Sequence, residues 1–131
     1  MVEREAAKAS EEFAHIREQQ EKQAALIAEF NKPPARTADQ LMALVQQMIA
    51  RAADRGLSEV EIYRFPSAVC TDKGRAINHF EPDWPRSLAG RPKLAHEFWK
   101  ERLEPLGFGL RATVIDYPGG FPGDVAFYLT W

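Results

Sequence analysis

The chain has 131 residues, of which 45% are hydrophobic and 27% are charged, and its formal net charge is −2. This length and composition are typical of one folded domain, and the near-neutral charge disfavours nucleic acid and anionic membranes as partners. The single cysteine, Cys70, excludes an internal disulfide and a zinc site made of several cysteines.

The beginning of the sequence is charged from Glu3 onward and lacks the apolar stretch of a signal peptide. The longest apolar stretches are far shorter than the roughly 20 residues that a membrane-spanning helix needs. We therefore expect a cytoplasmic protein that binds neither membranes nor nucleic acid.

Residues 3–30 predict one long helix, because Ala, Glu, Gln, Lys and Arg dominate the segment and it contains neither Pro nor Gly. Seven acids and four bases make this helix acidic. Apolar residues recur at spacings of three and four, which is a heptad-like stripe with glutamine at two of its positions. We predict that the stripe binds a partner through Phe13, Ile16, Gln20, Gln23, Ile27 and Phe30.

A helix of about 28 residues is about 42 Å long, which is more than a domain of this size needs to cover one face. Its apolar stripe must therefore be buried against something. Two alternatives remain open: the helix contacts a second copy or another protein, or it folds back on its own chain through residues 32–36. We expect residues 1–32 to form an amphipathic arm and residues 33–131 to form a small α+β domain.

Pro33 and Pro34 end the first helix, and Thr37 with Gln40 forms the capping-box pattern that begins a second one. Gly56 is placed to end this helix. Its buried face is predicted to consist of Leu41, Leu44, Val45, Met48, Ile49 and Ala52.

The remaining elements predict a three-stranded sheet in the order β-α-β-β, with helices packed on one face. Strands are expected at 60–65, 110–117 and 125–131, a short helix at about 72–80, and a longer helix at 93–106. The longer helix should turn Leu94, Phe98, Leu103 and Leu106 to the core, with Trp99 at its flank. The last strand should place Val125, Phe127, Leu129 and Trp131 on one face.

The densest polar segment, residues 67–79, follows the first strand, where loops commonly carry function. One reading is catalysis by Cys70 as nucleophile, with His79 as base and Asp72 or Asn78 orienting it. Another is binding of a phosphate or carboxylate by backbone N–H groups at the start of a short helix. Its ligand-binding residues would be Lys73, Gly74, Arg75 and Asn78.

Metal binding would require ligands such as His79, Cys70, Glu81, Asp83 or His96. Because their spacing lacks the close pairs of zinc sites, we expect no metal, and nothing in the sequence implies a cofactor.

Two further features could serve contacts. The glycine-rich loop 117–124 could approach a ligand closely, although a hairpin connection needs glycine and proline in any case. Trp84 should either plug the core or anchor a contact. We expect a non-enzymatic interaction or regulatory module that self-associates or docks through its first helix. The alternative is a small enzyme or a domain that binds anionic small molecules.

Overall fold

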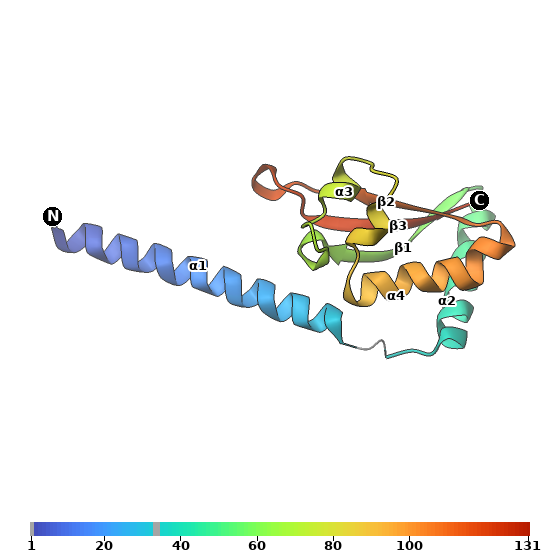
Figure 1. Ribbon diagram of the computed structural model, residues 1–131, viewed down its shortest axis with the longest axis horizontal. Helices are drawn as coiled ribbons and strands as arrows, with labels where there is room; N and C mark the ends of the chain where they lie inside the picture. The colour runs from blue at the N-terminus through green and yellow to red at the C-terminus, as the bar shows by residue number, and fades with distance from the viewer. Residues whose placement is uncertain (1, 33–34) are drawn as a thin grey trace.

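The computed structural model describes residues 2–32 and 35–131, with side chains for all of these except 2–9, 23 and 26. Helix α1, Val2–Asn31, is one continuous helix of 30 residues. Figure 1 shows that only its C-terminal end lies against the rest of the chain, while the other end projects away from it. The long first helix of the prediction is therefore confirmed.

Helix α2, Ala38–Asp54, begins with the predicted capping box. The backbone N–H of Gln40 donates to Oγ1 of Thr37 at 3.2 Å, and the Thr37 N–H donates to Oε1 of Gln40 at 2.9 Å. Two residues of the predicted stripe, Val45 and Ala52, are buried. Leu44, in contrast, is exposed, because the body covers only part of that face.

The sheet consists of β1 (Glu59–Pro66), β2 (Gly109–Val114) and β3 (Asp124–Thr130). Its order is β1-β3-β2, and β3 is antiparallel to both neighbours, so that β1 and β2 run parallel on either side of it. This arrangement of helices and an antiparallel sheet confirms the α+β class.

Strand β1 contains an irregularity that simple alternation does not predict. The pairing of β1 with β3 shifts register between Glu61 and Tyr63, which inserts one extra residue, Ile62. Ile62 and Tyr63 consequently both pack against the core, although they are neighbours in the chain. Arg64, which strict alternation from Ile62 would have turned to the core, is exposed.

The core lies on one face of the sheet. Helices α2 and α4, with the π turn that follows α4, cover one end of this face around Leu103 and Leu129. The segment after β1 covers the other end around Phe65, Ile77 and Phe127. The opposite face is polar: Arg64 pairs with Glu61 and Arg111 with Glu59, both at 2.8 Å.

Helix α4, Gly90–Phe98, starts three residues before the predicted helix and continues through a π turn at Trp99–Leu103. The wider π turn brings Phe98 and Leu103, five residues apart, into the same core cluster. Leu94 and Leu106 are exposed, so the prediction that they face the core was wrong. Phe98 and Leu103, by contrast, were correctly predicted to face the core.

The tryptophans differ in burial. Trp131 was predicted on the core face of the last strand, but it lies beyond β3 and is exposed, with its ring edge-on to Phe108. Trp84 is partly buried and its ring centroid lies 5.7 Å from that of Phe127, so it plugs the core. The indole N–H of Trp99 donates to the carbonyl of Phe108 at 3.0 Å.

Candidate functional site

Cys70 lies in the core rather than at an accessible site. Its side chain packs in the cluster of Phe65 and Phe127, and the residue is only 4% exposed. Burial, and to a lesser degree the charge of Asp72, raise the pKa of this thiol to about 11. His79 is exposed, and among the described residues no hydrogen bond or ion pair joins it to Cys70. The geometry gives the nucleophile hypothesis no support.

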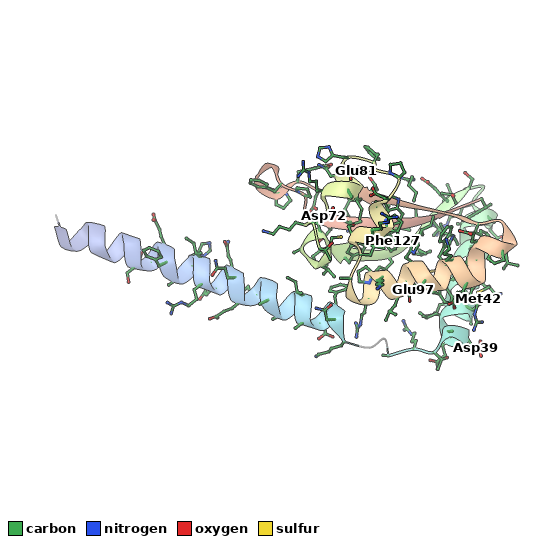
Figure 2. All side chains as sticks on the ribbon, in the orientation of Figure 1. Asp39, Met42, Asp72, Glu81, Glu97 and Phe127 are labelled. Atoms are coloured by element: carbon green, nitrogen blue, oxygen red, sulfur yellow. The ribbon has the colours of Figure 1, made fainter. Side chains whose placement is uncertain are left out.

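The short helix α3, Arg75–Asn78, does begin with a carboxylate on its backbone N–H groups, but that carboxylate belongs to the chain itself. The two carboxylate oxygens of Asp72 accept hydrogen bonds from the N–H groups of Gly74 and Ala76, each at 2.9 Å. Figure 2 shows Asp72 beside this helix. A bound anion would have to displace Asp72, so the predicted anion site has little room to form.

The segment 67–79 and the loop 117–124 together form one surface. The Ser67 hydroxyl donates to the carbonyl of Pro122 at 2.8 Å, and the Ser67 N–H donates to the carbonyl of Gly123 at 2.9 Å. The Tyr117 hydroxyl also donates to Oδ1 of Asn78 at 2.7 Å. Two segments that looked like separate candidates in the sequence are therefore joined.

Within the described part of the chain, no group of three or more His, Cys, Asp or Glu side chains is placed to hold a metal ion. His96 lies between the rings of Trp84 and Trp99, with centroids 5.6 Å and 5.5 Å away. Burial lowers the pKa of His96, and the neighbouring Lys100 lowers it further. These contacts give His96 a packing role.

The C-terminal end of α1 is attached to the body by apolar and polar contacts. Ile27 and Phe30 are partly buried against the core cluster, and the Phe30 ring meets the Tyr63 ring edge-on at 6.3 Å between centroids. The Arg91 Nε donates to the carbonyl of Lys32 at 3.0 Å. A Cβ on Gly90 would lie 2.6 Å from the Phe30 carbonyl oxygen, so glycine permits this close approach.

The outer part of α1 has no such cover. Phe13 is 71% exposed and Ile16 is 49% exposed, and every residue from 10 to 22 is exposed. Figure 2 shows this part of the helix standing clear of the body. Gln20 is exposed as well, whereas the side chain of Gln23 lies outside the described residues. Among the five of these residues whose side chains the structure describes, the fold-back alternative thus accounts only for Ile27 and Phe30.

A groove of about 530 Å³ lies where α1 meets the two joined segments, and we call it the α1–hairpin groove. Phe121, at its edge, is 76% exposed. The described residues that line the groove are Lys22, Ile27, Pro66, Ser67, Ala68, Lys73, Pro118, Phe121, Pro122, Gly123 and Asp124. Ile27 belongs both to the apolar stripe of α1 and to the lining of this groove, so the exposed part of the stripe and the groove are continuous.

A second groove, of about 350 Å³, lies between α2 and α4. Leu41 and Leu94 line its walls, and Ile62 and Tyr63 of β1 line it between the two helices. The hydroxyl of Tyr63 is buried without a hydrogen-bond partner in the described structure, and burial raises its pKa.

The fold and these surfaces define a small α+β domain with a projecting amphipathic helix. No known protein family, curated protein or solved structure matches the chain. Among the residues that the structure describes, none of the helices has both the length and the apolar character required to cross a membrane.

Proposed function

We propose that this protein is a protein-interaction module whose binding surface is the outer part of α1. The observation that carries the proposal is the division of one helical stripe into two parts. Ile27 and Phe30 pack against the body, while Phe13 and Ile16, on the same side of the helix, remain exposed.

Two physical arguments support this function. Complete burial of a Phe or an Ile side chain stabilises a structure by about 1.5–3 kcal/mol, so the exposed pair offers substantial binding free energy. In addition, isolated helices gain little stability without packing, and residues 10–22 have no buried side chain. A partner along this stripe would therefore stabilise the helix on which it binds.

The alternative function, a small enzyme or an anion-binding domain, has less support. Its proposed nucleophile, Cys70, is buried with a raised pKa, and the backbone groups of its proposed anion site already bind Asp72. We therefore prefer the interaction module.

The test compares two variants with the same kind of substitution on opposite sides of α1. Phe13→Gln with Ile16→Gln removes the exposed apolar pair but keeps good helix formers. Ala14→Gln, at an exposed position on the far side of the helix, is the matched control. Each variant and the wild type are immobilised in turn. The binding of untagged copies of the same chain, and of other proteins, to the immobilised chain is then measured.

We expect the wild type and Ala14→Gln to capture the same partner and the double variant to lose at least tenfold in affinity. If all three chains capture identically, or if none captures a specific partner, the proposed function is wrong. Circular dichroism of each variant checks that the helix content is unchanged.

A further inference from the structure

Between Phe13 and Phe30, the stripe of α1 reads the same in both directions. Its residues are Phe13, Ile16, Gln20, Gln23, Ile27 and Phe30, separated by three, four, three, four and three positions. Both the residue types and the spacings are therefore symmetric about the point between Glu21 and Lys22. A two-fold axis through that point superposes the stripe on its own reverse.

We propose that the partner of α1 is a second copy of this chain, bound antiparallel about this axis. This inference rests on the proposed function and identifies its partner and geometry. Phe13 of each copy lies opposite Phe30 of the other, Ile16 opposite Ile27, and Gln20 opposite Gln23. Heptad positions a and d alternate along the stripe. In an antiparallel pair, each a position of one copy lies opposite a d position of the other. Such an interface is isologous, so every contact occurs twice.

The position of the body favours the antiparallel arrangement over the parallel one. The body covers one side of α1 at Ile27 and Phe30. A parallel pair would bring two bodies to this same end of the stripe. An antiparallel pair instead brings only the exposed outer helix of the second copy, about 10 Å wide, to each body.

The α1–hairpin groove provides the place where that outer helix arrives. Ile27 lines the groove, and Ile27 and Phe30 are both only partly buried, so the surface that each leaves exposed can still contact Ile16 and Phe13 of the second copy. The charges of the two surfaces are complementary as well. The described lining of the groove has two bases, Lys22 and Lys73, and one acid, Asp124, so it is basic. The arriving segment, residues 10–22, carries four glutamates against two bases.

Spin labels distinguish this arrangement from its alternatives. In the chain of 131 residues, Ser10→Cys places a nitroxide at an exposed position of the outer helix. In the proposed register, the two Ser10 positions are 23 residues apart along the pair, which corresponds to about 35 Å. Wild-type chain treated in the same way is the control for labelling of Cys70, which is buried.

A distance near 35 Å between the labels of two copies supports the proposal. A distance below about 20 Å overturns it, because a parallel pair or an antiparallel pair of the outer halves alone gives such values. A monomer without dipolar coupling overturns it too. If that monomer still captures another protein through Phe13 and Ile16, the proposed function survives while the second copy is excluded as partner.

Discussion

Replacing Gly90 with alanine tests whether α1 is attached to the body where the structure places it. Gly90 has a φ of +59° and lies at the start of α4, directly against the last turn of α1. A Cβ at this position would lie 2.5 Å from Oδ1 of Asn31 and 2.6 Å from the carbonyl oxygen of Phe30. The exposed Asn31 side chain can move, but the carbonyl belongs to the helix backbone, so the end of α1 must shift.

Two contributions determine the expected loss of stability. Left-handed backbone costs a non-glycine residue about 1 kcal/mol. The shift also loosens Ile27 and Phe30, and because complete burial of such side chains is worth about 1.5–3 kcal/mol each, partial loss of both adds about 2 kcal/mol. We therefore expect Gly90→Ala to lower the free energy of unfolding by about 3 kcal/mol.

Gly56→Ala is the matched control, because Gly56 has a φ of +75° and a Cβ added there would have no atom within 4 Å. It should cost only the backbone contribution of about 1 kcal/mol. Urea unfolding followed by tryptophan fluorescence measures both variants. Equal losses for Gly90→Ala and Gly56→Ala would show that α1 does not pack against Gly90, and the assignment of Ile27 and Phe30 to the attached end would then fail.

Three further predictions concern groups in the body. Burial raises the pKa of Cys70 from 9.0 to about 11, so its contribution to stability is complete below pH 9 and is lost as the pH rises toward 11. In Cys70→Ala, the urea concentration at the midpoint of unfolding should therefore fall less at alkaline pH than in the wild type. An unchanged pH profile would contradict this. The pKa of His96 is lowered from 6.5, so its contribution to stability is present above pH 6.5 and is lost as the pH falls below that value. In His96→Gln, the urea midpoint should therefore fall less at acid pH than in the wild type. A curve that is shifted by the same amount at every pH would disprove this. Asp72→Ala removes the acceptor for two N–H groups and should cost about 1 kcal/mol. It should also speed thiol labelling of Cys70 at pH 9, since the Asp72 charge contributes to the raised pKa; an unaltered labelling rate would refute that coupling.

Local patterns predicted most elements because their causes are local. The capping residues Thr37 and Gln40 satisfy backbone groups within one helical turn, and they form the predicted hydrogen bonds. The alternating residues of β3 likewise place Val125, Phe127 and Leu129 in the core. Two of the departures, at Ile62 in β1 and at Trp99–Leu103, each insert one residue into a regular repeat. Such insertions depend on packing against distant segments, so periodicity alone cannot reveal them.

The candidate sites depended still more on tertiary contacts. The sequence singled out 67–79 as polar but could not show that Asp72 takes the backbone N–H groups of its own helix, or that Cys70 is buried. It also could not show that Tyr117 reaches Asn78 across the fold. The burial of Cys70 and the contact of Tyr117 with Asn78 depend on distant segments, about which spacing along the chain carries no information. The Asp72 hydrogen bonds are local, but the sequence does not distinguish a carboxylate that caps its own helix from one that leaves the N–H groups open to a ligand.

The sequence by itself determined the length of α1, its acidic character and the symmetric order of its stripe, since helical geometry converts spacing directly into a face. Only the tertiary structure decided which part of that stripe is covered. Gly90 lets the last turn of α1 approach α4 closely, and Ile27 and Phe30 pack there, while Phe13 lies too many turns away to reach the body. Close packing between segments about 60 residues apart, such as those that contain Phe30 and Gly90, decides where α1 is attached to α4.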